Sequence, residues 1–135
     1  MKLLLLALFV TFSLSATRAF AADSEPSSAA KGGALYHVVS FKFKESATKA
    51  QIKEVEDAFA ALPTKIPTIR SFAGGVDVSP EKRSKGFTHC WVLTFATEKD
   101  RDGYINDPAH KAFGKLVGPV VEDVFVIDFW STASK

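Results

Sequence analysis

Two spacings of apolar residues alternate along the middle of the chain. Residues 35–44, LYHVVSFKFK, carry β-branched and aromatic side chains on both faces of a predicted strand. Residues 48–62 repeat apolar side chains every three or four positions with charged side chains between them, which predicts an amphipathic helix. Thr48 and Gln51 have the spacing of a capping box at its start, and Pro63 is expected to end it.

An extended pattern follows this helix. Residues 66–80, IPTIRSFAGGVDVSP, and residues 87–95, FTHCWVLTF, predict the two strands of an antiparallel hairpin joined by a polar turn. Gly74 and Gly75 predict either a bulge or a close approach of the backbone to another group.

Proline divides the next helical stretch. Residues 97–107 predict a short helix that ends before Pro108, and residues 108–120 predict a second one. Residues 121–130, VEDVFVIDFW, predict a last strand that is apolar on both faces. The order strand, helix, strand, strand, helix, strand predicts an α+β fold, a ferredoxin-like βαββαβ protomer with a four-stranded antiparallel sheet and its helices on one face.

The second face of this sheet is too apolar for a surface in water. Val38, Ser40, Cys90 and Val92 fall on the face opposite the strand histidines, and residues 121–130 are apolar whichever way they point. An apolar patch of that size usually marks an interface, so we expect two sheets to pack face to face as a homodimer. The alternative is a monomer with scattered exposed valines. Within its strand, Cys90 is expected to be a small buried hydrophobe rather than a reactive thiol.

The first residues resemble an export signal. A basic residue, an apolar run of 12 residues and a small-residue site predict a signal peptide over residues 1–21, cleaved after Ala21. The run is short for a membrane anchor, which is the alternative. We therefore expect export to a periplasm or the medium, with no membrane attachment after cleavage. Residues 22–33 predict a flexible leader, residues 34–131 the domain, and residues 132–135 a tail.

Charge and cysteine content exclude some classes of function. The chain has 17 Lys and Arg against 15 Asp and Glu. Cleavage would remove Lys2 and Arg18, leaving 17 − 2 = 15 basic residues, so the mature protein is nearly neutral. Without a concentrated basic surface, no nucleic-acid partner is expected. A single cysteine cannot form an internal disulfide, so packing must hold the domain together.

Five segments, in their order and spacing, resemble a known family. They are HVVSFKFKE, IPTIRSFAGGVDVS, GFTHCWVLTF, YINDPAHKAF and VFVIDFW, and together they are similar to the stress-responsive dimeric α/β-barrel (Dabb) domain family. The resemblance implies a ferredoxin-like protomer, a homodimer whose sheets form a barrel, and no cofactor. Members include plant stress proteins, a plant polyketide cyclase that acts by an aldol-type condensation, and many bacterial proteins without known activity.

The resemblance to the cyclase implies a set of site residues. Its working pair corresponds to Tyr104 and His110, and its strand histidines to His37 and His89. The chain differs from the cyclase at Asp107, Phe59 and Trp91, which changes the pocket and the expected substrate. The predicted ligand-binding residues are His37, Val39, Phe41, Phe59, His89, Trp91 and Phe113.

The helix junction at residues 104–113 has the composition of an acid/base site. Asp107 is expected to cap a helix, with Pro108 first and His110 third in it. The helix dipole there opposes protonation, so a neutral His110 could act as a general base and Tyr104 as a hydrogen-bond donor. The alternative is structural: a histidine that ties down the helix start and a tyrosine packed in the core.

Three functions remain open at this point. The leading one is a stress-response protein that binds a small hydrophobic or aromatic molecule in a pocket between sheet and helices. The second is a cofactor-independent lyase or cyclase that uses Tyr104 and His110. The third is a haem-degrading or antibiotic-biosynthesis-type monooxygenase, in which Asn106, Trp91 and a histidine would matter. No metal site is expected, because the three histidines lack HxH or HExxH spacing.

Overall fold

The computed structural model describes residues 33–131. The predicted signal peptide (1–21), the predicted tail (132–135) and all of the predicted leader (22–33) except Gly33 lie outside these residues. No helix within the described range is both long and apolar enough to cross a membrane. In chain order the elements are β1 (Leu35–Phe43), α1 (Lys49–Ala60), α2 (Leu62–Lys65), β2 (Ser71–Val76), β3 (His89–Phe95), α3 (Glu98–Asn106), α4 (Pro108–Val117) and β4 (Val121–Trp130).

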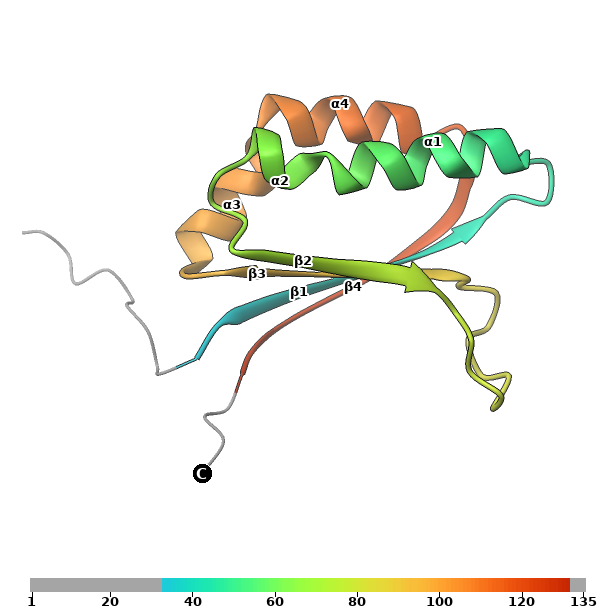
Figure 1. Ribbon diagram of the computed structural model, residues 1–135, viewed down its shortest axis with the longest axis horizontal. Helices are drawn as coiled ribbons and strands as arrows, with labels where there is room; N and C mark the ends of the chain where they lie inside the picture. Colours follow the sequence, from blue (N-terminus) through green and yellow to red (C-terminus); the bar gives the residue numbers. More distant parts are fainter. Residues whose placement is uncertain (1–32, 132–135) are drawn as a thin grey trace, which may run out of the picture.

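The strands form one antiparallel sheet with the order β2-β3-β1-β4. The helices lie on one side of it (Figure 1). This is the ferredoxin-like βαββαβ arrangement, with each helical connection divided into two pieces, and it confirms the predicted fold class. Strand β1 is central, so its side chains have neighbours on both β3 and β4.

The helix starts follow the local sequence, while one predicted end is wrong. The side-chain oxygen of Thr48 accepts from the Gln51 amide at 3.2 Å, and the Gln51 side chain accepts from the Thr48 amide at 2.9 Å, which is the predicted capping box. Helix α1 ends at Ala60, before Pro63. Pro63 instead lies in the first turn of α2, where a proline costs no hydrogen bond. Leu62, predicted in the first helix, therefore belongs to α2.

The hydrophobic core lies between the helices and the sheet. It is built from the helix-facing side of β1 and β3 and from one face of each helix, as the spacing of apolar residues predicts. Its buried members are Leu35, Val39, Phe41, Val55, Phe59, Leu62, Ile66, Ile69, Trp91, Leu93, Phe95, Tyr104, Phe113, Val117, Val120 and Val121.

The two glycines of β2 differ in their surroundings. Strand β2 pairs with β3 in an unbroken register, so the expectation of a bulge is wrong and that of a close approach is right. A Cβ atom on Gly74 would lie 2.2 Å from Cδ1 of Trp91, whereas one on Gly75 would meet nothing within 4 Å. The register shift in the sheet lies instead between Lys42 and Phe43, where β1 pairs with β4.

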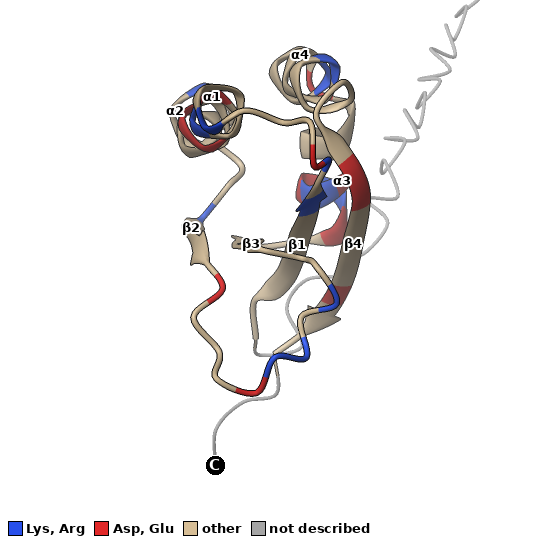
Figure 2. Ribbon diagram, turned by 90° about the vertical axis from the view of Figure 1, so that its right-hand side faces the viewer, with Lys and Arg blue, Asp and Glu red and all other residues tan. Residues whose placement is uncertain are grey.

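The other side of the sheet is open. Figure 2 shows α1, α2 and α4 gathered on one side of the strands. On the opposite side, Val38 and Ser40 of β1 lie beside Ile127 and Phe125 of β4. Cys90 is also exposed, so the expectation of a buried thiol is wrong for a single chain. The half-exposed apolar side chains of this open face are Phe125 (50%), Ile127 (46%) and Phe129 (47%).

Candidate functional site

A cavity of about 640 Å³ opens between the helix-facing side of β1 and β4 and the helices α3 and α4. Its polar side chains form two groups. His37, Tyr104 and His110 lie at one end, while Glu122 and Asp123 lie near the start of β4. The remaining lining residues are Val39, Phe41, Phe59, Ile105, Phe113, Gly114, Val117, Gly118, Val121, Val124 and Val126.

Three phenylalanines from three elements form the aromatic wall of the cavity. The ring of Phe59 on α1 lies 4.7 Å from that of Phe113 on α4 and 6.0 Å from that of Phe41 on β1. Rings at these separations attract one another and fix each other's position. The three rings therefore give the cavity an apolar aromatic side.

Tyr104 lies between the two histidines of the cavity. Its ring centroid is 5.5 Å from that of His37 and 4.5 Å from that of His110. The residue is 1% exposed, and this burial raises the pKa of Tyr104 well above its usual range. The phenol therefore keeps its proton at any physiological pH and can donate a hydrogen bond to an oxygen in the cavity.

His110 has the position in α4 that the sequence predicts. Asp107 caps the helix through its side chain, which accepts from the Ala109 amide at 2.7 Å. Nδ1 of His110 lies 3.1 Å from the carbonyl oxygen of Ile105. Burial is the largest influence on the pKa of His110 and lowers it, and a charge on His37 would lower it further. The imidazole is therefore neutral at neutral pH, with burial rather than the helix dipole as the main cause.

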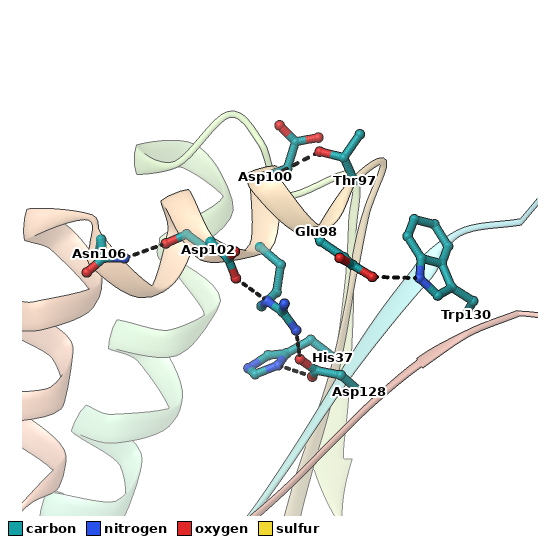
Figure 3. Close-up of polar contacts among 9 residues, drawn as sticks. His37, Thr97, Glu98, Asp100, Asp102, Asn106, Asp128 and Trp130 are labelled. Atoms are coloured by element: carbon teal, nitrogen blue, oxygen red, sulfur yellow. Dashed lines mark hydrogen bonds and ion pairs between the residues drawn. The ribbon is translucent and has the colours of Figure 1, made fainter. Parts of the chain in front are cut away.

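His37 is held by a side chain of β4, Asp128 (Figure 3). Its Nδ1 lies 2.6 Å from Oδ1 of Asp128, which is directly opposite on β4. Oδ2 of Asp128 in turn accepts from Nη1 of Arg101 on α3. Arg101 also donates through Nε to Asp102 at 2.7 Å. The imidazole is thus fixed by a chain of hydrogen bonds that reaches the protein surface.

Both histidines of the cavity lining use the same ring nitrogen, Nδ1, for their contact with the protein. A carbonyl oxygen and a carboxylate only accept hydrogen bonds, so Nδ1 carries the proton in His110 and in His37. In a neutral imidazole, the lone pair is then on Nε2. The cavity therefore combines two acceptors with one phenol donor.

The structure does not bring two of the predicted ligand-binding residues to this cavity. His89 lies on β3, which is separated from β4 by β1. Its Nε2 is 3.0 Å from Oε1 of Glu56, and its Nδ1 is 2.9 Å from the Thr88 hydroxyl. Trp91 is 4% exposed and packs between Gly74 and the core. Both belong to β3, beneath α1. The five that line the cavity are His37, Val39, Phe41, Phe59 and Phe113.

Sequence reasoning missed Asp128 and Arg101. Asp128 is the one charged residue among residues 124–130 of β4, and a carboxylate within that apolar run is the signal that could have drawn attention to it. Within residues 33–131, no group of three or more His, Cys, Asp and Glu side chains is placed to hold a metal ion.

The chain is similar in sequence to known proteins. The chain matches the family model described as "Stress responsive A/B Barrel Domain" over residues 35–131. It is 30% identical over 96 residues to olivetolic acid cyclase from Cannabis sativa, a match that covers 71% of this chain and 95% of the cyclase.

Two solved structures have a similar fold. Hydroxynitrile lyase from Passiflora edulis matches with a TM-score of 0.70 at 24% identity, over 76% of this chain and 97% of the lyase. A dimeric ferredoxin-like protein of unknown function from Thermobifida fusca matches with a TM-score of 0.65 at 23% identity, over 75% of this chain and 93% of its own. At these identities the likeness establishes the fold alone.

Proposed function

This chain belongs to the stress-responsive A/B barrel domain family, and on that premise we propose that it acts as a homodimer that binds a small hydrophobic or aromatic molecule in the cavity between its sheet and helices. The observation that carries the proposal is the composition of the cavity. The cavity of about 640 Å³ has a mostly apolar lining, with His37, Tyr104 and His110 clustered at one end and two carboxylates near the start of β4. Ligand sites typically enclose roughly 300–1,000 Å³ and combine an apolar lining with a few converging polar groups.

A pair of probes that differ in one carbonyl group tests this site. Acetophenone and ethylbenzene have similar size, but only acetophenone can accept a hydrogen bond from Tyr104. We expect both to bind, and Tyr104→Phe to weaken acetophenone roughly two- to tenfold while leaving ethylbenzene unchanged, as befits one hydrogen bond. Titration followed by NMR would measure both affinities.

The chain offers a matched control for this substitution. Its only other tyrosine, Tyr36, stacks on Phe129 on the open face, with ring centroids 5.1 Å apart. Tyr36→Phe removes the same hydroxyl away from the cavity and should leave both affinities unchanged. A wild-type protein that binds neither probe would remove the ligand-binding proposal, and an equal loss of both in Tyr104→Phe would remove the role of the hydroxyl.

The open face supports the homodimer. Its half-exposed aromatic and aliphatic side chains would be covered by a second copy of the sheet. The face is also hollowed: a depression of about 820 Å³ includes Ser40, Cys90 and Phe125 in its wall. The similar protein from Thermobifida fusca is described as dimeric. A two-fold axis would place these same residues against each other.

Acid/base catalysis of the lyase or cyclase type is the second candidate. The observation that favours it is that the proton of each cavity imidazole is tied up at Nδ1, which leaves Nε2 as a base. Nε2 of His110 would take a proton from a carbon beside a carbonyl group. The electron pair of that C–H bond would move to the carbonyl oxygen, where the Tyr104 hydroxyl would stabilise the enolate. No cofactor is needed for this step.

Hydrogen exchange into a bound ketone tests catalysis separately from binding. The methyl protons of acetophenone should exchange with D₂O faster in the presence of the protein. His110→Gln should abolish this acceleration while acetophenone still binds. Binding without any acceleration by the wild-type protein would leave a binding protein and exclude the catalytic candidate.

The arrangement does not favour the monooxygenase alternative. Nδ2 of Asn106 donates to the Asp102 carbonyl oxygen at 2.9 Å, within α3. Trp91 lies outside the cavity, as described above. Neither Asn106 nor Trp91 therefore lines the cavity that holds His37 and His110.

Export is the last part of the proposal. It is supported by the apolar run, which follows a basic residue and ends in small side chains over residues 1–21. A cleaved signal would deliver the domain to a periplasm or to the medium, where the absence of an internal disulfide leaves packing alone to stabilise it.

A further inference from the structure

The contacts of His37 form a single line from the cavity to the surface. The side chains of His37, Arg101 and Asp128 are 8%, 20% and 25% exposed, so the pairs are partly shielded from water. They come from three elements, β1, α3 and β4, which are brought together only by the fold (Figure 3). The other titratable groups beside His37 are Tyr104 and His110.

Two members of this line, Arg101 and Asp128, have a fixed hydrogen-bonding character. Arginine can only donate, and an ionised carboxylate can only accept. Arg101 therefore occupies Oδ2 of Asp128 and holds the carboxylate so that Oδ1 faces His37. His37 must then donate from Nδ1, which leaves the lone pair of the neutral ring on Nε2 of a residue that lines the cavity.

We propose that Arg101 and Asp128 are positioning residues that set the tautomer of His37 and so make it a second hydrogen-bond acceptor in the cavity. The role in ligand binding rests on the proposed ligand site, whereas the tautomer itself can be tested without any ligand. Neither residue touches the ligand, since neither lines the cavity. They act instead through His37, because its tautomer decides whether the ring can accept a hydrogen bond from an O–H or N–H group of a ligand.

Replacing Asp128 by asparagine is expected to invert the tautomer of His37. In Asp128→Asn, one side-chain position accepts and the other donates. Arg101 can only pair with the oxygen, so it turns the amide NH₂ toward His37. Nδ1 of His37 must then accept, and the proton moves to Nε2. The tautomer should therefore invert, and this inversion should require Arg101.

The ¹⁵N chemical shifts of the imidazole nitrogens report the tautomer directly, and they are measured without ligand. At about pH 8, where histidine is neutral, wild-type His37 should show the proton on Nδ1 and Asp128→Asn should show it on Nε2. The double variant Arg101→Met with Asp128→Asn frees the amide to turn either way and should show a mixture. A matched control is Lys53→Met, which breaks the exposed 2.6 Å pair with Asp57 and should change nothing at His37.

Each result decides the proposal. A wild-type proton on Nε2 would overturn it, as would an Asp128→Asn protein that keeps the proton on Nδ1 or a double variant identical to Asp128→Asn. A network that merely ties α3 to β4 would change stability without this pattern of inversion and mixing.

A second measurement covers the case in which Asp128→Asn does not fold. The Nδ1 proton of His37 should exchange with water slowly in the wild type and about tenfold faster in Arg101→Met, because losing one charge-assisted contact costs about a factor of ten. Equal exchange rates would overturn the role of Arg101. If acetophenone and ethylbenzene fail to bind while the tautomers behave as expected, the ligand site fails and the positioning role stands.

Discussion

Replacing Gly74 by alanine adds one methyl group where the tryptophan of the neighbouring strand passes. The new Cβ would lie 2.2 Å from Cδ1 of Trp91, whereas carbon atoms in contact are about 3.5–4.0 Å apart. Trp91 cannot retreat, because its ring is 4.8 Å from that of Phe59 and 5.0 Å from that of Phe41 on the other side. Strand β2 or the aromatic cluster must therefore move.

The cost of such overpacking is about 1–3 kcal/mol. Gly75→Ala is the matched control, because its methyl group would meet nothing within 4 Å. Reduced freedom of the unfolded chain should stabilise that variant by about 0.5 kcal/mol. The two adjacent substitutions should therefore differ by about 2.5 kcal/mol, or roughly 10–20 °C in melting temperature for a domain of this size.

Urea denaturation at one fixed protein concentration would measure both variants. Fixed concentration matters because a dimer gains stability by mass action. Phe41 and Phe59 also line the cavity, so Gly74→Ala should weaken ethylbenzene binding while Gly75→Ala leaves it unchanged. Equal stability of the two variants would show that Trp91 does not pack on β2 as described.

Three further predictions concern the interface, the cavity and export. Ile127→Asp places a charge on the open face and should give monomers in sedimentation velocity at micromolar concentration. The control Val78→Asp, at a position 92% exposed, should leave the dimer intact. Dimers that persist in Ile127→Asp would refute the face-to-face arrangement. Burial lowers the pKa of His110 below its ordinary value of 6.5, so its contribution to stability is fully present above about pH 6.5 and is lost as the pH falls toward the folded-state value. Unfolding free energies measured between pH 5 and 8 should therefore rise with pH, with a smaller rise in His110→Gln, and identical slopes would contradict the neutral buried imidazole. Terminal sequencing of the exported protein should begin at Ala22, and a mature chain that keeps Met1 would contradict cleavage.

Local sequence patterns were sufficient for the elements and their order. The period-two run of β1, the capping box at Thr48 and the helix start at Asp107 each depend on neighbours in sequence, and all are present in the structure. The open face was also predictable, because alternation showed apolar side chains on both sides of the last strand. Pro63 was misjudged because a proline fits the first turn of a new helix as well as it ends an old one.

The site was predicted only in part, because alternation gives the face of a sheet but not the place along it. His37, His89 and Trp91 share the helix-facing side, yet the last two lie on β3 and face α1, away from the cavity beside β4. Asp128 becomes the partner of His37 through the register of β1 with β4. No pattern within either strand specifies that register, so the contact could not be read from the sequence.

The first and last residues of the domain are hydrogen-bonded to each other. The Ala34 amide donates to the Ser131 hydroxyl at 2.9 Å, and the Ser131 amide donates to the Ala34 carbonyl oxygen at 2.9 Å. A short glycine-rich bridge could join the two residues, with new ends opened in the exposed turn around Lys82, and such a circularly rearranged chain should still fold. A cargo joined directly to Ala34 or to Ser131 would therefore start from the same end of the sheet.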